Sequence, residues 1–134
     1  MRQKPNPTLD ILVVDDDRDL AGEFKEHLSE GGWKVETAYS AQEALLMTSD
    51  FQPRLIIADI KMPGMNGIEM SQIIDRFADA PCVILMSGDA SSIWVANNVF
   101  TGAFAILEKP VPLHILEHFI RRKLSRPEPA TPAN

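Results

Sequence analysis

Acidic, hydroxyl and amine side chains follow closely after four apolar segments of the sequence. Asp15 and Asp16 come after ILVV, Asp59 after LIIA, Ser87 after CVILM, and Lys109 two residues after FAIL. A buried strand has little use for a charge at its end unless solvent, a cation or a reaction accounts for it. These residue types suit a site for a cation and a phosphate group, because carboxylates bind hard cations while ammonium and hydroxyl groups pair with phosphoryl oxygens.

The elements that would position these residues are five short strands separated by helices. The apolar segments span residues 11–14, 33–38, 55–58, 82–86 and 104–107. Between them, apolar residues recur at the three- or four-residue spacing of helices, most weakly over residues 91–100. This alternation predicts an α/β fold, a flavodoxin-like (βα)5 doubly wound parallel sheet with the strand order 2-1-3-4-5. The segment 33–38 alternates polar with apolar residues, which favours an edge strand.

The predicted strand order brings three carboxylates together. The carboxyl ends of parallel strands share one rim of the sheet, and neighbouring strands lie ~4.8 Å apart. Because the first and third strands are expected to be neighbours, Asp15 or Asp16 should approach Asp59. Unpaired carboxylates would repel one another, and a bound divalent cation would offset this repulsion. In a cytoplasm we expect this cation to be Mg²⁺. A carboxylate such as Asp59 can itself be a nucleophile toward phosphorus, with Lys109 and Ser87 contacting the phosphoryl oxygens.

The next acidic residue, Asp17, has a structural interpretation that competes with metal binding. Asp is a preferred N-cap residue, and we favour Asp17 as the cap of the first helix. Gly31 and Gly32 would end that helix, and Ser40 followed by Glu43 predicts a capping box for the second.

Composition excludes several classes of protein. A chain of 134 residues is long enough for one hydrophobic core, and its 13 basic against 19 acidic residues give a net charge of -6, which disfavours nucleic acid as a direct partner. The one cysteine, Cys82, lies in an apolar segment, so we expect it to be a core residue. A single cysteine without an internal disulfide is typical of a protein in a reducing compartment. No stretch approaches the ~20 apolar residues of a membrane span. A cytoplasmic location is therefore expected.

The motifs VVDDD, IIADIKMPGMNG, MSG and EKP, in this order and each after its own strand, make the chain resemble the receiver domain of two-component response regulators. The resemblance spans roughly residues 9–124. It implies that Asp59 is the phospho-acceptor. It also implies that Asp16, Asp59 and the backbone carbonyl of Lys61 bind Mg²⁺, with Asp15 contributing mainly through water.

The same resemblance assigns residues on the fourth and fifth strands. Ser87 matches the hydroxyl that moves toward the phosphoryl group, and Lys109, before a Pro110 that is cis in the family, matches its ion partner. The family usually has Tyr or Phe three residues before this lysine, whereas this chain has Ile106. Phe104 shares the face of Ile106 by the two-residue period but would lie ~6.6 Å back along the strand, so aromatic gating is in doubt.

We predict an N-terminal tail at residues 1–8, a receiver domain at 9–124 and a Pro-rich tail at 125–134, SRPEPATPAN, with no output domain after it. The predicted function is that of a single-domain response regulator. It would accept a phosphoryl group from a phosphohistidine onto Asp59 and signal through phosphorylation-dependent protein binding or phosphotransfer. It would not be an enzyme beyond assisting its own phosphorylation and dephosphorylation.

By the same resemblance, the partners would be a histidine kinase or histidine phosphotransfer protein. The fourth helix, fifth strand and fifth helix would form the docking or homodimer face. Two other functions stay open. A Mg²⁺-dependent phosphatase could work through an aspartyl-phosphate, but residues 59–61 lack a second acid for turnover. A phosphate-independent scaffold would not need the intact Asp16, Asp59, Ser87 and Lys109.

Overall fold

Strands and helices alternate along the whole of the described chain. The structure is a computed structural model that describes residues 9–124, so the predicted tails lie outside the described residues. The elements are β1 (Ile11–Val14), α1 (Arg18–Glu30), β2 (Val35–Ala38), α2 (Ala41–Phe51), β3 (Leu55–Asp59), α3 (Gly67–Ile74), β4 (Cys82–Ser87), α4 (Ala90–Asn98), β5 (Ala105–Glu108) and α5 (Leu113–Leu124).

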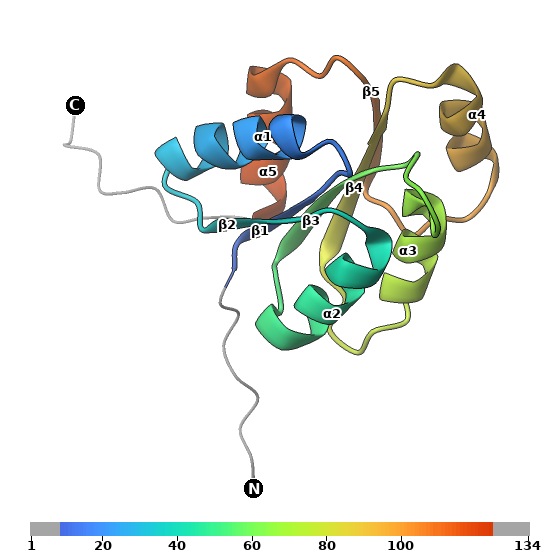
Figure 1. The fold of residues 1–134 in the computed structure, drawn as a ribbon, viewed down its shortest axis with the longest axis horizontal. Helices are drawn as coiled ribbons and strands as arrows, with labels where there is room; N and C mark the ends of the chain where they lie inside the picture. Colours follow the sequence, from blue (N-terminus) through green and yellow to red (C-terminus); the bar gives the residue numbers. More distant parts are fainter. Residues whose placement is uncertain (1–8, 125–134) are drawn as a thin grey trace, which may run out of the picture.

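The five strands form one parallel sheet in the order β2-β1-β3-β4-β5 (Figure 1). This confirms the predicted fold class and strand order, and β2 lies at an edge as its polar alternation indicated. In the register, Val14 pairs with Ala58, and Asp59 pairs with Met86. The acidic residues after β1 and at the end of β3 therefore reach the same rim of the sheet.

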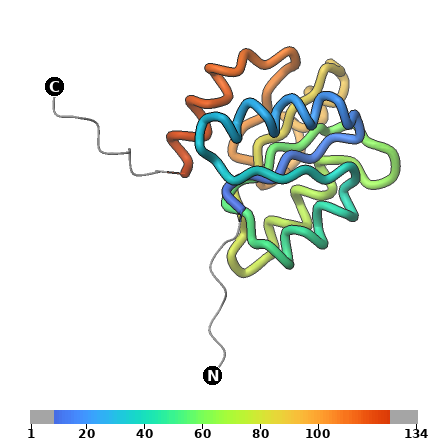
Figure 2. The backbone as a smooth tube through the Cα atoms, turned by 60° about the vertical axis from the view of Figure 1, so that its left-hand side comes forward, coloured from blue at the N-terminus to red at the C-terminus, as the bar shows by residue number. Residues whose placement is uncertain are grey.

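Helices cover both faces of the sheet, and each face has its own hydrophobic core. Helices α1 and α5 cover one face, while α2, α3 and α4 cover the other (Figure 1). In Figure 2 the blue α1 and the red-orange α5 lie above the strands, and the teal α2 lies below them. Alternate residues of β1 and β3 point to opposite cores, so that Val13 and Ile57 meet α1 and α5 while Leu12 and Ile56 meet α2 and α3.

Two strands begin later than the apolar segments suggested. The second begins at Val35, because the N–H of Trp33 donates to Leu28 O at the end of α1 (3.3 Å). The fifth comprises Ala105–Glu108, so Phe104 precedes the strand. The Phe104 ring packs on Phe119 of α5, with ring centroids 6.0 Å apart, whereas Ile106 packs with the α2 and α3 side. The expectation that Phe104 and Ile106 share a face was wrong, because the two-residue period holds only inside a strand.

The ends of the first two helices follow the predicted caps with one exception. Asp17 is the N-cap of α1 and accepts from Leu20 N (3.1 Å), and Gly31 is the C-cap that follows its last residue. Ser40 accepts from Glu43 N (3.1 Å) as predicted. The Glu43 carboxylate instead accepts from Tyr39 N (2.7 Å), so the reciprocal half of the capping box is displaced by one residue.

Helix α3 has the complete capping box, which was not predicted. The Asn66 side chain accepts from Glu69 N (2.9 Å), and the Glu69 carboxylate accepts from Asn66 N (3.1 Å). The helix ends at Ile74. Cys82, at the start of β4, is half-buried rather than fully buried.

Candidate functional site

The end of β1 delivers one buried and one exposed carboxylate to the rim. The N–H of Asp15 donates to Ala38 O (3.0 Å), which extends the pairing of β1 with β2 by one residue. Asp15 as a whole residue is 2% exposed, and its Oδ1 accepts from Asp17 N (2.9 Å). Asp16, one residue on, is exposed at the mouth of the site. Asp15 is thus fixed by the backbone, while Asp16 keeps its oxygens toward solvent.

Asp59 lies at the end of β3, a strand in which every residue is buried. The backbone just beyond it is held from two sides, because Ile60 N donates to Met86 O (2.9 Å) and Gly67 N donates to Ile60 O (2.8 Å). A Cβ on Gly67 would lie 2.4 Å from the Asp59 backbone oxygen, closer than any side chain permits. Glycine at position 67 therefore allows the start of α3 to close onto the backbone of Asp59.

Burial raises the pKa of Asp59. The loss of solvent is the largest cause, and the nearby carboxylates of Asp15 and Asp16 act in the same direction. The Lys109 ammonium opposes them through its charge and a hydrogen bond. The site therefore holds more negative charge than its one lysine offsets, which favours a further cation.

Lys109 reaches back from the end of β5 to both buried carboxylates. Its Nζ lies 3.2 Å from Asp15 Oδ2 and 3.6 Å from Asp59 Oδ1. The peptide bond between Lys109 and Pro110 is cis, as the family resemblance implied. The Lys109 N–H donates to Ser87 O (2.8 Å), which ties the lysine backbone to the end of β4.

The carboxylates of Asp15, Asp16 and Asp59 could hold a metal ion. One oxygen from each lies within 4.8 Å of the others. Mg²⁺ binds oxygens at ~2.1 Å, so ligands on opposite sides of the ion lie ~4.2 Å apart. The three carboxylates are therefore close enough together to contact one such ion. The donor set, all oxygen and all anionic, fits a hard divalent cation.

Ser87 ends β4 and is buried, and its hydroxyl is already engaged. Its Oγ accepts from Asp89 N (3.0 Å). The Asp89 carboxylate in turn accepts from Ser91 Oγ (2.8 Å), Ser92 Oγ (2.7 Å) and Ser92 N (3.1 Å). These hydrogen bonds, with Ser92 first, lower the pKa of Asp89. A chain of hydrogen bonds thus connects the rim to the first turn of α4.

The structure brings most of the predicted site residues to one place. Asp15, Asp16, Asp59 and Lys109 converge at the carboxyl ends of the strands, and Ser87 lies on the same rim, opposite Glu108 in the register. Lys61 is exposed two residues after Asp59, and metal binding by its backbone carbonyl stays a prediction.

Two contributors were not recognised from the sequence. The packing role of Gly67 was not predicted, and Asp89 was not identified as the cap of α4. The pattern Asn66-Gly-Ile-Glu69 could have signalled the capping box that begins α3, and Asp before two serines could have signalled the other cap. The close approach of Gly67 to Asp59 has no local sequence signal.

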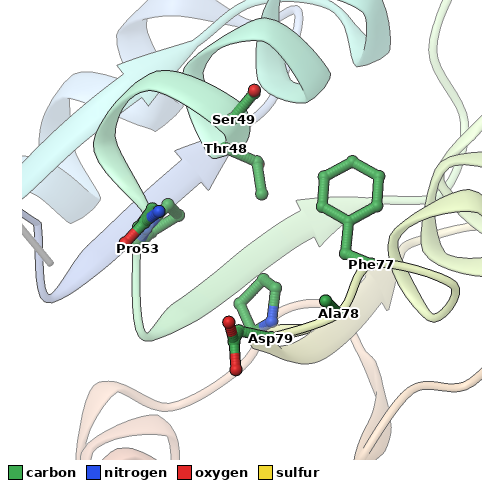
Figure 3. Close-up of a pocket in the computed structure, with 8 residues that line it drawn as sticks. Thr48, Ser49, Pro53, Phe77, Ala78 and Asp79 are labelled. Carbon is green, nitrogen blue, oxygen red and sulfur yellow. The ribbon is translucent and has the colours of Figure 1, made fainter. Parts of the chain in front are cut away.

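An apolar groove of about 440 Å³ lies directly beside Lys109. It runs between the first half of α1 and the segment that joins β5 to α5, and its lining residues are Leu20, Glu23, Phe24, Lys109, Pro110, Val111 and Leu113. A second pocket, of about 350 Å³, lies between the end of α2 and the segment before β4, where Thr48, Pro53 and Phe77 face one another (Figure 3). None of the rim residues lines that second pocket, so it is separate from the acidic site.

Comparison with known proteins agrees with the fold and identifies the family. The family model of the response regulator receiver domain matches residues 11–121. The response regulator MprA of Mycobacterium avium (strain 104) is 36% identical over 120 residues, which cover 89% of this chain and 52% of that protein. The chain therefore spans about half the length of these curated relatives.

Solved structures show the same architecture. A CheY-like receiver domain from Methanospirillum hungatei JF-1 superimposes with a TM-score of 0.77 at 31% identity, covering 86% of this chain and 92% of that one. The response regulator TrrA of Thermotoga maritima, solved in complex with Mg(2+)-BeF, gives a TM-score of 0.72 at 28% identity and covers 84% and 96% of the two chains.

A doubly wound parallel sheet with an acidic cluster at its carboxyl rim places the chain in the flavodoxin-like fold class. More narrowly, the chain belongs to the response regulator receiver domains of two-component systems. Within residues 9–124, no helix has the length and apolar character needed to cross a bilayer.

Proposed function

We propose that the chain accepts a phosphoryl group on Asp59 from a phosphohistidine and signals by binding other proteins or by passing the group on. The observation that carries this proposal is the convergence of three carboxylates, with oxygens within 4.8 Å, on one ammonium 3.6 Å from Asp59 Oδ1. In the transfer, a carboxylate oxygen of Asp59 bonds to phosphorus as the P–N bond breaks, and the imidazole leaves with the electron pair.

The other residues of the site have distinct proposed roles. Asp15, Asp16, Asp59 and the backbone carbonyl of Lys61 would hold Mg²⁺, which when bound balances negative charge on the transferring group. Lys109 would move from the carboxylates to a phosphoryl oxygen, because its Nζ is already within 4 Å of both. Ser87 would donate its hydroxyl to another phosphoryl oxygen.

The apolar groove beside Lys109 is proposed as the docking site of the phosphohistidine protein. A donor must hold its imidazole next to Asp59, and the groove shares Lys109 with the site. Phe24 of α1 and Leu113 of α5 provide apolar contact area on its two sides. Leu113→Glu should slow transfer from a phosphohistidine protein about tenfold or more, yet leave phosphorylation by phosphoramidate unchanged. Equal rates with both donors would contradict this docking site.

The face formed by α4, β5 and α5 is proposed as the surface for a target or a second copy. Trp94 and Phe100 are 66% and 72% exposed there, and residues 90–100 carry no charged side chain. The uncharged α4 part of this face suits self-association of a chain with a net charge of -6, because like charges are kept away from that part of the contact. Sedimentation with and without Mg²⁺ and beryllium fluoride would detect a dimer that depends on the activated state.

The two alternative functions have less support. Asp15, the buried carboxylate beside Asp59, accepts hydrogen bonds from Lys109 and from the Asp17 backbone, which disfavours it as a general base for turnover. A scaffold that never carries phosphate would have no need to bury Asp59 at an energetic cost. A cytoplasmic location and the absence of further enzymatic activity remain parts of the proposal.

Incubation with phosphoramidate and Mg²⁺ followed by intact-mass spectrometry tests the proposal. Wild type should gain one phosphoryl group, and Asp59→Asn should gain none. Chelation of the metal should lower the rate by at least tenfold, because the phosphoryl charge would then be uncompensated. The proposal is wrong if the adduct forms on another residue, or if wild type forms none.

A further inference from the structure

Helix α4 is attached to the rest of the molecule very differently at its two ends. Its first turn is held through Asp89, whose carboxylate accepts three hydrogen bonds from Ser91 and Ser92. Asp89 is anchored in turn by the hydrogen bond from its N–H to Ser87 Oγ (3.0 Å). The start of α4 thus depends on a hydroxyl that the proposed function would draw toward the phosphoryl group.

The segment that follows α4 is fastened to α3. Ser71 Oγ donates to Thr101 O (2.7 Å), and both residues are buried. One residue along each segment, Gln72 Nε2 donates to Phe100 O (2.9 Å). Thr101 Oγ1 also accepts from Ala103 N (3.0 Å), which closes the turn into β5. None of these hydrogen bonds involves a residue of the acidic site.

A close contact reinforces the same attachment. Gly102 has φ +78, and a Cβ at this position would lie 2.8 Å from the side-chain atoms of Asp75, at the end of α3. Only glycine adopts this backbone without strain and also leaves room for Asp75. The far end of α4 is therefore held by two hydrogen bonds and one tight packing contact.

Between its two ends α4 is packed lightly. Ala96 is its one fully buried residue, and Ile93 is half-buried against the core of the α2, α3 and α4 side. Trp94 and Val95 face solvent. Asn98 Nδ2 donates to Trp94 O (2.7 Å) inside the helix rather than to a neighbour. Little in the middle of the helix opposes a rotation of the whole element.

Helix α3 is suited to be a fixed support. Its first residue, Gly67, is locked against the backbone of Asp59, and five of its eight residues are buried. By contrast, the start of α4 is linked to the sheet through Ser87. A change at the rim would therefore displace the start of α4 while α3 keeps its far end in place.

We propose that α4 acts as a lever that pivots on α3, with residues 100–102 as the pivot held by Ser71, Gln72 and Asp75. The inference rests on the proposed function and concerns how the phosphorylated site is read out. Because Ile106 replaces the usual aromatic residue, the pivot gives this chain a readout that needs no aromatic side chain in β5. Movement of the lever reorients Trp94, the most exposed aromatic side chain of the helix.

Amide NMR shifts of the full chain, before and after addition of Mg²⁺ and beryllium fluoride, test the pivot. In wild type, shift changes should be largest over residues 88–92 and several-fold smaller over 100–102. Gln72→Ala, which removes a partly exposed anchor, should raise the changes at 100–102 at least twofold. Ser71→Ala should do the same with greater effect. Ser49→Ala, a serine on the exposed side of α2, is the matched control and should reproduce the wild-type profile.

The outcomes separate this inference from the proposed function. If phosphoramidate and Mg²⁺ place no phosphoryl group on Asp59, the proposed function fails. If the adduct forms but wild type shows equal changes at both ends of α4, the pivot is wrong. The pivot is also wrong if Gln72→Ala and Ser71→Ala both behave like Ser49→Ala. Because Gln72 lies near the surface, its variant keeps the test valid should loss of the buried Ser71 hydroxyl impair folding.

Discussion

The elements that hold Asp59, namely β1, β3 and α3, are packed more tightly than α4 and β5, which would report its phosphorylation. All residues of β1 and β3 are buried, and α3 buries five of eight residues. In β5 three residues are half-buried and one is exposed, and α4 buries one residue of nine. Local stability follows such burial. The comparison teaches that the geometry of the acidic site is fixed by a core that extends beyond it, whereas less buried surface holds α4 and β5 in place.

The largest expected effect comes from removing core volume in each half. Ile57→Ala in β3 should lower the free energy of unfolding by roughly 2–5 kcal/mol, because the side chain is fully buried. Ile106→Ala in β5 should cost only about 1 kcal/mol, since that side chain is half-buried. Urea unfolding followed by circular dichroism measures both. Equal losses would break the comparison.

A smaller loss of stability is expected from adding a side chain where the start of α3 contacts the backbone of Asp59. Gly67→Ala should destabilise the fold by roughly 1–3 kcal/mol, because the new Cβ would overlap the Asp59 backbone oxygen. Phosphorylation by phosphoramidate should also slow as Asp59 shifts. The matched control is Gly22→Ala in α1, where no atom lies within 4 Å and helix propensity should add about 0.5–1 kcal/mol. A Gly67→Ala variant as stable and as fast as wild type would remove the claim that this contact fixes the acceptor.

The smallest expected effect is a difference between the pKa values of two carboxyl groups, Asp59 and Asp89, in the metal-free protein. Burial raises the pKa of Asp59, whereas hydrogen bonds from Ser92 and Ser91 lower the pKa of Asp89. For Asp59 the folded state binds its proton more tightly than the unfolded chain, so its contribution to stability is lost as pH rises through the raised pKa. For Asp89 the contribution is present at neutral pH and is lost as pH falls through the lowered pKa.

Carbon-detected NMR titration of the side-chain carboxyl groups should resolve these opposite directions. Ser92→Ala should move the pKa of Asp89 upward and leave that of Asp59 where it was, because it removes a hydrogen bond to Asp89 alone. If the pKa values of both groups lie above that of an ordinary aspartate, or both lie below it, the two environments do not differ as described.

The site could be predicted largely because its residues follow strands whose order is itself predictable. Asp15, Asp59 and Lys109 each come after an apolar segment, and a parallel sheet gathers the ends of such segments at one rim. Asp17 was recognised as a cap from residue type and place alone. In these cases a local pattern and a general rule of topology were sufficient.

The features that escaped prediction depend on contacts between distant segments. Ser71 and Thr101 are 30 residues apart, and nothing in either local sequence indicates that they meet. Phe104 was given the face of Ile106 because the start of β5 was placed one residue early, and its ring is held by Phe119 of α5. A side chain just outside a strand is not held to the alternation of the strand. It packs on whichever face of the sheet offers a contact, and the contacting residue belongs to another element.

The fit of Gly67 against Asp59 has a consequence for protein engineering. A chimera that transplants the acceptor segment of this receiver into another would have to carry residues 59–67 as one cassette, since the carboxylate and the glycine eight residues later share a single steric constraint. A junction placed between Asp59 and Gly67 would combine the acceptor backbone of one protein with the start of α3 from the other, and the two would not fit together.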